Sequence, residues 1–384
     1  MAALGGASRS AIGLDIGTSL FRAAQLSPGS ISPVLLNYGS IKVPVGSVVE
    51  GEIVDIEAAA YALSHLWKNS GFSQKEVVIG VASQRVVVRL VTMPYMSQEE
   101  LTGAIQFQAQ DYIPIPIEEA IVDAQIVNEF VEGEGERKME VLLVAAQKDM
   151  IQNTVAAVES AGLRPTAIDL SSFALARSLV PEGRFALPEA TDDVDKQGVG
   201  TAIALINISF GLTNIVVVEE GVPRFARVTP LAGSDLTQSI ADALGLTFEE
   251  AEELKVSVGL PPLDESGPVS GDDLPENLRT HAAAAQNVLE NQVTHFIAEI
   301  RRSLDYYMTQ ATEVREITTL ILSGAGSKLR NFPAHLERGL QAKVEIGDPL
   351  AQLQATPKLD ASVLEREKVS LAVSIGLALR DFRS

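Results

Sequence analysis

A short strand–turn–strand pattern occurs twice in this chain, about 190 residues apart. The first copy reads Ala-Ile-Gly-Leu-Asp-Ile-Gly-Thr-Ser and ends at Ser19. The second reads Ala-Ile-Ala-Leu-Ile-Asn-Ile-Ser-Phe-Gly and ends at Gly211. In both, an apolar run leads into a turn of small or polar residues, and a second apolar run follows. The copies align with one insertion, and about half of the 384 residues separates them. A repeat on this scale predicts a duplicated α/β unit.

The rest of the chain is organised around these two copies. Residues 181–200 are acidic and rich in proline and glycine, which predicts a linker between the halves. A second acidic loop with several prolines, at 259–275, separates predicted helical regions at 235–258 and 281–309. The later predicted elements are a buried strand at 319–322, a helix at 329–340 and an apolar helix at 369–380.

The stretch 97–145 is predicted to be a compact inserted module. Ser97 and Glu100 have the spacing of a capping box, so a helix should begin there and run to about Tyr112. The Ile-Pro-Ile-Pro-Ile sequence that starts at Ile113 cannot be helical, because each proline lacks an N–H donor and restrains the residue before it. The remaining predicted elements are strands at 120–127 and 140–145, with the charged loop 132–138 between them.

Composition excludes several classes of function. The net charge of −20 opposes binding to phosphodiester backbones, so nucleic acid is not an expected partner. The chain has no cysteine, which excludes disulfides, thiolate zinc sites and cysteine nucleophiles. No stretch reaches the roughly 20 apolar residues of a membrane helix, and the N-terminus does not resemble a signal peptide. We therefore expect a cytoplasmic protein without direct membrane insertion.

The first turn has the composition of a phosphate-binding loop. Gly17, Thr18 and Ser19 offer backbone N–H groups and two hydroxyls to one small volume. Phosphate oxygens need dense donors, and glycine permits close approach of the backbone. Asp15 directly precedes the turn, and a carboxylate is tolerated beside phosphates chiefly when Mg²⁺ lies between them. The composition is suited to a phosphate site, but Gly-Thr-Ser turns are common, and from this turn alone an ordinary hairpin is the simpler interpretation.

Three further elements fit a nucleotide site, and each also has a simpler interpretation. The second turn, between Asn207 and Thr213, would face the terminal phosphate if the two copies meet. The small-residue turn 324–327 lies between a strand and a helix, where a base or sugar can lie against the backbone. Glu252 and Lys255 share one face of a predicted helix, as they would in a solvated ion pair.

Taken together, these elements resemble the superfamily of actin, heat-shock chaperones, sugar kinases and FtsA. Longer segments resemble the type IV pilus assembly PilM family in particular, and this resemblance covers nearly the whole chain. The segments are Ile-Gly-Leu-Asp-Ile-Gly-Thr-Ser at 12–19, 103–117 with its Asp-Tyr-Ile-Pro-Ile-Pro, Arg-Arg-Ser-Leu-Asp-Tyr-Tyr at 301–307, 322–329, and Ile-Gly-Leu-Ala-Leu-Arg at 375–380.

The resemblance implies an α/β fold with actin-like (ribonuclease H-like) duplicated domains around a nucleotide cleft. It also implies an FtsA/PilM-type inserted small subdomain. The expected boundaries are 1–96, 146–197 and 366–384 for the first actin-like subdomain, 97–145 for the insertion, 198–235 and 317–365 for the second actin-like subdomain, and 236–316 for a helical subdomain over the cleft.

The resemblance further implies ATP and Mg²⁺ as ligands. Asp15 would hold Mg²⁺ through water, Gly233 would lie close to the nucleotide, and Glu252 with Lys255 would flank the ribose and base. The full set of expected nucleotide-site residues is Asp15, Gly17, Thr18, Ser19, Asn207, Gly211, Thr213, Gly233, Glu252, Lys255, Gly324, Gly326 and Ser327.

Members of the PilM family bind the cytoplasmic N-terminal tail of a bitopic inner-membrane protein, PilN, and lie near the motor ATPases of the pilus machine. The resemblance therefore implies an adaptor that is peripheral to the inner membrane through its partners. It leaves self-association open. The residues expected in the groove for an extended PilN-like peptide are Val88, Leu90, Phe107, Tyr112, Ile113 and Ile115.

The second turn departs from the superfamily's usual Asp-x-Gly and reads Asn207-Ile208-Ser209. Asparagine carries no charge to organise Mg²⁺ waters or to polarise an attacking water. Ser209 adds a side chain where glycine allows close approach. We therefore predict that ATP binds but is hydrolysed slowly or not at all.

Two alternatives belong to other functional classes. An FtsA-like division protein would carry an amphipathic membrane helix after a linker, and the sequence given ends at Ser384 without one. A sugar or acid kinase would need a catalytic acid over a substrate pocket, and the sequence offers no carboxylate in that setting.

Overall fold

The computed structural model describes residues 10–29, 32–133, 135–180, 200–263, 276–310 and 314–382. The predicted linker at 181–200 lies outside the described residues except for Gly200. Most of the predicted loop at 259–275 also lies outside them.

The first half of the chain is built on a six-stranded sheet with the order β10-β6-β1-β2-β3-β16. β1, β2 and β3 are antiparallel neighbours, whereas β6 and β10 extend the sheet in parallel. The strands are β1 (Ala11–Ile16), β2 (Leu20–Ser27), β3 (Val34–Lys42), β6 (Glu76–Val81), β10 (Arg164–Leu170) and β16 (Gln354–Ala355). α1 (Ile56–Ser70) and α3 (Lys148–Ser160) pack on one face, and α4 (Ser171–Leu179) and α11 (Ala372–Ala378) pack on the other.

The second half repeats this pattern in a five-stranded sheet with the order β13-β12-β11-β14-β15. Three antiparallel strands are again extended by two parallel ones, which is the order of β3-β2-β1-β6-β10 in the first half. The predicted duplication is therefore confirmed. The strands are β11 (Gly200–Ile208), β12 (Thr213–Glu219), β13 (Val222–Thr229), β14 (Val314–Ser323) and β15 (Lys343–Ile346).

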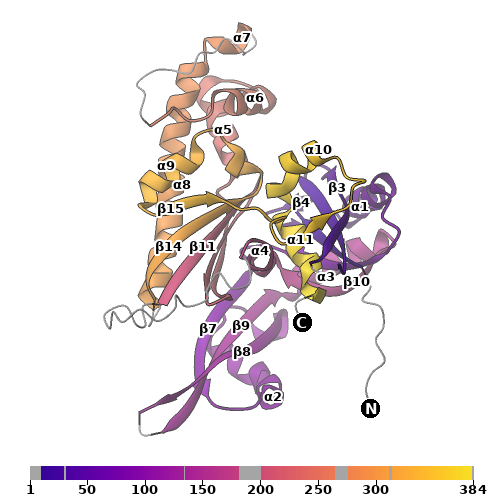
Figure 1. Ribbon diagram of the computed structural model, residues 1–384, viewed down its shortest axis with the longest axis vertical. Coiled ribbons are helices and arrows are strands. Elements are labelled where there is room, and N and C mark those ends of the chain that lie inside the picture. Colours follow the sequence, from indigo (N-terminus) through magenta and orange to yellow (C-terminus); the bar gives the residue numbers. More distant parts are fainter. Residues whose placement is uncertain are drawn as a thin grey trace.

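The helices of the second half lie in the upper and left parts of Figure 1, and the long helix α8 runs down alongside its sheet. They are α5 (Gly233–Leu244), α6 (Phe248–Val258), α7 (Glu276–Arg279), α8 (Ala282–Gln310) and α9 (Phe332–Leu340). α5, α6, α8 and α9 cover one face of the five-stranded sheet, and the other face packs on α4 and α11 of the first half. This second contact sets how the two halves meet.

The predicted helical region 235–258 is occupied by two helices, α5 and α6. α5 ends at Gly245, which has a left-handed φ of 66°. The hydroxyl of Thr247 then accepts the Glu250 N–H, and the Glu250 carboxylate returns to the Thr247 backbone in a capping box. A helix was also expected from residue 329, but it begins only at Phe332, after the 3₁₀ turn Ala325–Lys328.

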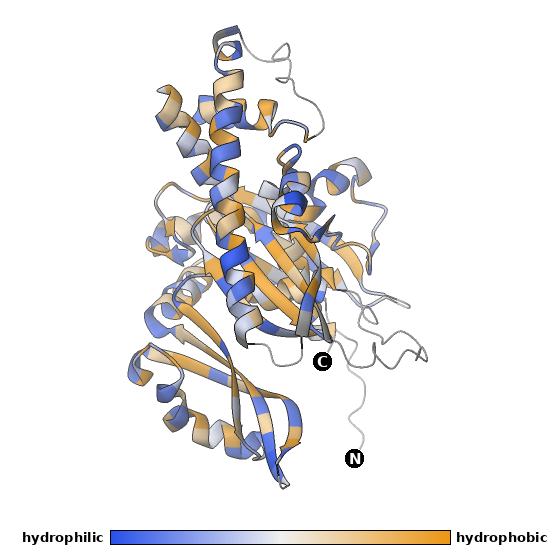
Figure 2. Ribbon diagram, turned by 90° about the vertical axis from the view of Figure 1, so that its left-hand side faces the viewer, coloured by the Kyte–Doolittle hydropathy of each residue, from blue (hydrophilic) through white to orange (hydrophobic). Residues whose placement is uncertain are grey.

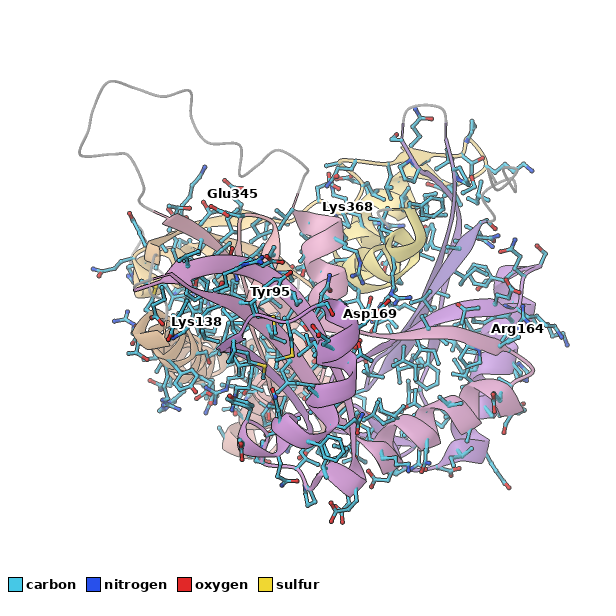
Figure 3. All side chains as sticks on the ribbon, turned by 90° about the horizontal axis from the view of Figure 1, so that it is seen from below. Tyr95, Lys138, Arg164, Asp169, Glu345 and Lys368 are labelled. Carbon is cyan, nitrogen blue, oxygen red and sulfur yellow. The ribbon has the colours of Figure 1, made fainter. Side chains whose placement is uncertain are left out.

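The inserted module is a three-stranded sheet with the order β7-β9-β8, covered by one helix. Its elements are β7 (Val86–Pro94), α2 (Gln98–Gln108), β8 (Ala120–Glu132) and β9 (Glu136–Gln147). The predicted capping box of Ser97 and Glu100 is confirmed. β7 precedes the expected start at residue 97, and the predicted loop 132–138 is mostly strand. Figure 3, seen from this end, shows Tyr95 and Lys138 on the module.

Short elements complete the fold. β16 pairs with β3, so the chain near residue 354 joins the first sheet rather than the second. In Figure 2, apolar residues concentrate along the strands of the sheets, whereas the outer helices carry mixed surfaces. Among the helices of the described residues, none is long and apolar enough to cross a membrane. The short elements are β4 (Val48–Val49), β5 (Glu52–Ile53), α10 (Ala361–Glu367) and the 3₁₀ turns Lys368–Leu371 and Leu379–Phe382.

Candidate functional site

The two repeated turns face each other across the junction of the halves. In each hairpin four residues separate the last pair in register: 17–20 lie between Ile16 and Phe21, and 209–212 lie between Ile208 and Thr213. A Cβ added to Gly211 would lie 2.7 Å from Oγ1 of Thr18, so only glycine allows this approach of the second turn to the first. Residues of both turns line one small cavity, as the sequence predicts for two facing hairpins.

Strand register places equivalent residues of the two copies in equivalent positions. In the first hairpin Asp15 lies opposite Arg22, and in the second Asn207 lies opposite Asn214. A cross-strand pair of opposite charges in the first copy is therefore a pair of neutral amides in the second. All four residues line the cavity between the turns.

Asp15 is an unusual carboxylate. Desolvation by burial raises its pKa to about 6, and the nearby Arg22 guanidinium only partly opposes this rise. Because burial destabilises the ionised form of this carboxylate, a cation placed beside it would stabilise that form. Among the described residues, no cluster of three or more acidic or histidine side chains is arranged for a metal. Any Mg²⁺ here would therefore rely on Asp15, water and phosphate oxygens.

Two buried polar atoms at this junction have no hydrogen-bond partner within the described chain, Oγ1 of Thr18 and Oδ1 of Asn214. Buried groups of this kind normally find a partner, and an unsatisfied one costs about 1–3 kcal/mol. The Thr18 hydroxyl can donate to a phosphate oxygen, and the Asn214 carbonyl can accept from a water or a ligand N–H. With Asp15, this donor and acceptor set fits a hydrated Mg²⁺–phosphate group.

The cavity itself is small. Its volume is about 30 Å³, close to the space that one water occupies in the liquid. A cavity of this size holds a water or a small ion between the two turns, but not a triphosphate.

Asn207 and Ser209, which stand in place of the usual Asp-x-Gly, both make hydrogen bonds within the second half. Asn207 is buried and donates from Nδ2 to Oγ of Ser323 at 2.9 Å. A carboxylate could not make that donation. The Ser209 hydroxyl donates to the Leu212 carbonyl at 2.8 Å, which closes its own turn. The Thr213 hydroxyl also has a partner within the protein, since it donates to the Leu231 carbonyl.

Gly233, Glu252 and Lys255 come together as expected, but they do not line the cavity. The Lys255 ammonium donates to the Gly233 carbonyl at 3.1 Å, to Thr237 Oγ1 at 2.7 Å and to Glu252 at 2.7 Å. All three of its protons are thus used inside the protein. The Gly233 N–H in turn donates to the Ser209 carbonyl, so this cluster supports the second turn from behind.

Gly324 and Gly326 pack against Ile208 at the end of β11, and Ser327 follows them in the same short turn. Gly324 has φ +81°, and a Cβ there would lie 2.3 Å from the Ile208 carbonyl oxygen. A Cβ on Gly326 would lie 2.4 Å from the Ile208 side chain. The Ser327 hydroxyl donates to the Gly324 carbonyl at 2.7 Å. Close packing on β11 therefore explains these small residues without a ligand.

The sequence prediction missed several residues that line the cavity. Arg22 and Asn214 could have been found by counting across the four-residue turns, because cross-strand partners of a hairpin are fixed by its length. No local pattern identifies the lining residues that come from outside the two hairpins: Ala82 just after β6, Ser171 at the start of α4 and Val373 of α11.

A separate groove of about 610 Å³ lies between the inserted module and the second half. Its walls are β7 and β13, each an edge strand of its sheet, and Glu299 and Tyr306 of α8 close one side. Of the six residues expected at a peptide groove, Val88 lines it. Leu90 lies farther along β7, and Phe107 and Tyr112 are exposed on the far side of the module's core. Ile113 and Ile115, at 6% and 5% exposed, lie inside that core.

Basic and acidic side chains hold this groove together. Arg227 pairs with Glu299 at 2.7 Å and donates to Ser303 at 3.1 Å. At the other end of β13, Arg224 donates to Glu140 of β9 at 3.0 Å and lies 3.6 Å from Glu219 of β12. Arg224 therefore bridges the inserted sheet and the second half.

Comparison with known proteins places the chain in one family. Residues 13–267 and 270–382 match the family described as type IV pilus assembly protein PilM. A solved structure titled PilM–PilN type IV pilus biogenesis complex has a TM-score of 0.78 at 25% identity, covering 97% of this chain and 99% of that one. MreB5 of Spiroplasma citri, with a TM-score of 0.52 at 13% identity over 99% of this chain and 100% of its own, shares the actin-like fold.

Two curated relatives are cell division proteins. FtsA of Bacillus subtilis strain 168 is 26% identical over 370 residues, which are 88% of this chain and 78% of that protein. FtsA of Escherichia coli K12 is 27% identical over 219 residues, which are 54% of this chain and 48% of that protein. The family match extends over nearly all of the chain. The protein therefore belongs to the type IV pilus assembly protein PilM family, in the FtsA-like branch of the actin-like fold.

Proposed function

We propose that this protein is a cytoplasmic, nucleotide-binding adaptor of the type IV pilus inner-membrane assembly. It would bind ATP and Mg²⁺ between its halves, and the cytoplasmic N-terminal peptide of a PilN-like membrane protein in the groove between β7 and β13. A related type II secretion system would be served in the same way. Pilus motor ATPases are a further expected class of partner.

The observation that carries the nucleotide proposal is the meeting of the two repeated turns around Asp15. The carboxylate, the unpartnered Thr18 hydroxyl and the backbone of a glycine-containing turn present the donors and the negative charge that Mg²⁺–phosphate requires. Bound Mg²⁺ would neutralise phosphate charge there. Asp15 would orient its waters, and the Thr18 hydroxyl would donate to a phosphate oxygen.

Slow or absent hydrolysis follows from the second turn. The Asn207 amide is neutral and donates to Ser323, so it supplies no base toward a water on the phosphate side. The Ser209 hydroxyl is engaged by Leu212 within its own turn. The protein would thus remain loaded with ATP, as suits an adaptor more than a rapid enzyme.

The peptide proposal rests on the PilM–PilN complex, which is similar along its whole length, and on the two edge strands. Edge strands leave main-chain N–H and C=O groups unpaired on one side, and an extended peptide can satisfy them while its side chains enter the groove. Apolar side chains of Val86, Val87 and Val228 line the groove beside Arg89 and Arg227. An extended, mainly apolar peptide fits this lining.

Calorimetric titration of the purified protein tests both the nucleotide proposal and the peptide proposal. We expect binding of Mg·ATP without turnover, and binding of a synthetic peptide with the N-terminal sequence of the organism's PilN-like protein. Val228→Arg places a charge on the groove wall and should abolish peptide binding but leave nucleotide binding intact. Val131→Arg, on the 64%-exposed side chain near the tip of β8, is the matched control. Peptide binding that survives Val228→Arg would exclude this groove.

The FtsA-like alternative has support from the Bacillus subtilis relative. It makes a different prediction, because a division protein of that kind would not select a PilN-like peptide. Failure of the peptide to bind the wild type at all, with nucleotide binding retained, would favour this alternative.

A further inference from the structure

A groove that takes no part in the sites described above lies between α8 and α9, on the second half. It shares no lining residue with the nucleotide cavity or with the β7–β13 groove. Its volume of about 620 Å³ falls within the range of about 300–1,000 Å³ that is usual for ligand pockets. The two helices pack on each other in the left part of Figure 1. We name it the arginine groove, after three of its lining residues, Arg301, Arg302 and Arg338.

The arginine groove has an apolar floor that follows α8. Val293 and Ile297, one turn apart, form this floor beside the small side chain of Ala298. The α8 residues that line the groove extend from Val293 to Asp305, and a helix of that length rises about 18 Å. The groove is therefore long enough for about three turns of another helix laid along it.

The walls of the groove are fixed by contacts between elements. A Cβ added to Gly339 of α9 would lie 2.7 Å from Cδ1 of Ile297, so glycine is what lets the two helices approach. Arg301 of α8 donates to the Gly339 carbonyl. His335 of α9, which is 6% exposed, is hydrogen-bonded through Nε2 to the Pro261 carbonyl at 2.9 Å. A ligand would therefore meet a preformed surface and would lose little binding free energy to ordering it.

The groove is basic although the chain as a whole has a net charge of −20. Arg338, exposed in the last turn of α9, has no carboxylate within salt-bridge distance among the described residues. Arg302 pairs with Glu299, but the same carboxylate also pairs with Arg227, so one negative charge serves two guanidinium groups. Among the described residues that line the groove, Asp305 is the one acid. The groove thus keeps positive charge that an acidic ligand can neutralise.

Three other classes of ligand fit this groove poorly. A free phosphate group is usually held by converging backbone N–H groups, whereas the N–H groups at these positions are used within α8 and α9. An extended peptide usually adds to the edge of a sheet, and both walls here are helices. A flat membrane surface does not reach a recessed floor, and anionic lipid headgroups repel a chain of this charge. A groove between packed helices is instead a setting in which an amphipathic helix docks.

We propose that the arginine groove binds an acidic amphipathic helix of another protein. The apolar residues of that helix, four positions apart, pack on Val293 and Ile297. Its acidic residues follow along the same side and face Arg301 and Arg338. Because the arginine groove is separate from the β7–β13 groove, the protein would hold this partner and a PilN-like peptide at the same time.

Fluorescence anisotropy of a labelled peptide, titrated with the full-length protein, tests the proposal. The probe is a capped, alanine-based helix of about 14 residues, with two leucines four positions apart and then three glutamates on the same side. We expect saturable binding with a Kd of about 10–100 μM in low salt, and weaker binding as salt is added. Replacing the glutamates with glutamines should weaken binding at least about tenfold, and so should scrambling the sequence. A probe that does not bind at about 1 mM would overturn the proposal.

Two substitutions test whether the probe lies in the groove. Arg338→Glu reverses the charge of the arginine that has no carboxylate beside it, and it should weaken binding at least about tenfold. Arg366→Glu is the matched control, because Arg366 is likewise exposed in the last turn of a helix, α10. Ala298→Trp fills the floor with an indole ring and should abolish binding, whereas Ala283→Trp, at an exposed site nearer the start of α8, should not. All four side chains are exposed, so each variant should unfold in urea at the wild-type midpoint.

These variants separate a seat in the groove from a general attraction between charges. Equal weakening by Arg338→Glu and Arg366→Glu would mean that the probe senses only net charge, and would overturn the proposal. Binding that survives Ala298→Trp would overturn it as well. Displacement of the probe by vesicles that contain phosphatidylserine would identify a membrane as the occupant, with the same consequence. Arg302 is left unchanged because Glu299 joins it to Arg227 of the β7–β13 groove, so binding of a PilN-like peptide should be the same in every variant.

Discussion

Asp15→Asn is expected to stabilise the nucleotide-free protein and to weaken its binding of Mg·ATP. Burial raises the Asp15 pKa from 3.8 to about 6. Because the folded pKa lies above the unfolded one, the protonated carboxyl favours folding below about pH 4, and this stability is lost as the pH rises through 6. This rise in the pKa corresponds to about 3 kcal/mol of stability. This is an upper limit, because the partly exposed group is screened by water.

The assay is urea unfolding of both proteins at several pH values. The variant should equal the wild type below about pH 4, and exceed it by up to about 3 kcal/mol at pH 8. For a chain of 384 residues that unfolds as one unit, this corresponds to a Tm higher by about 4 °C. Asp111→Asn, at an exposed site on the inserted module, should change little at any pH.

Binding gives the second half of the test. Mg²⁺ needs the ionised carboxylate, so the wild type should release a proton when it binds Mg·ATP near pH 6 and almost none at pH 8. Calorimetry in buffers of different ionisation enthalpy measures this release, which should vanish in the variant. An Asp15→Asn protein that is less stable than the wild type at pH 8 would refute the reasoning. It would mean that the attraction to Arg22 outweighs the cost of burial.

The remaining predictions concern the second turn and the junction of the halves. The double substitution Asn207→Asp and Ser209→Gly restores the usual Asp-x-Gly. It should raise the steady-state ATPase rate at least about tenfold. A wild-type protein whose ATPase rate is already typical of an ATPase would contradict this expectation. Gly324→Ala should lower the free energy of unfolding in urea by about 1–3 kcal/mol more than Gly46→Ala. Both glycines have φ near +80°, but only at Gly324 would the added Cβ meet a backbone oxygen. Equal losses of stability would show that only backbone conformation matters. Arg224→Met, with a side chain 11% exposed, should lose about 3–5 kcal/mol because the partly buried carboxylates of Glu140 and Glu219 lose the guanidinium that bridges them. Arg164→Met, 70% exposed, should lose less than about 1 kcal/mol in the same assay, and similar losses would remove the argument from burial.

Much of the fold could be predicted from local patterns. The duplicated hairpins, the capping box of Ser97 and the apolar periodicity of the long helix each report on backbone conformation within a few turns of the chain. The break at Gly245 was missed although glycine followed by a capping Thr247 is itself a local signal. There, the continuous apolar pattern outweighed a C-cap that was present in the sequence.

The candidate site could be predicted only in part. Residues of the two turns were identified because their composition is suited to phosphate. Glu252 and Lys255 were assigned by spacing, yet Lys255 is buried and its protons are used by Gly233, Thr237 and Glu252. Whether a side chain faces a ligand or supports a neighbouring turn depends on packing between elements, which spacing along one helix does not contain.

The sequence by itself determined that this chain is a duplicated α/β protein with an inserted module and two similar strand–turn–strand hairpins. These properties follow from short-range sterics and hydrophobic periodicity, which act within single elements. Only the tertiary structure decided that Arg22 and Asn214 join the cavity, that β7 and β13 form a groove, and that Phe107 is exposed while Ile113 is buried. Those outcomes depend on which faces of distant elements bury each other, and that choice is made by the packing of the whole chain.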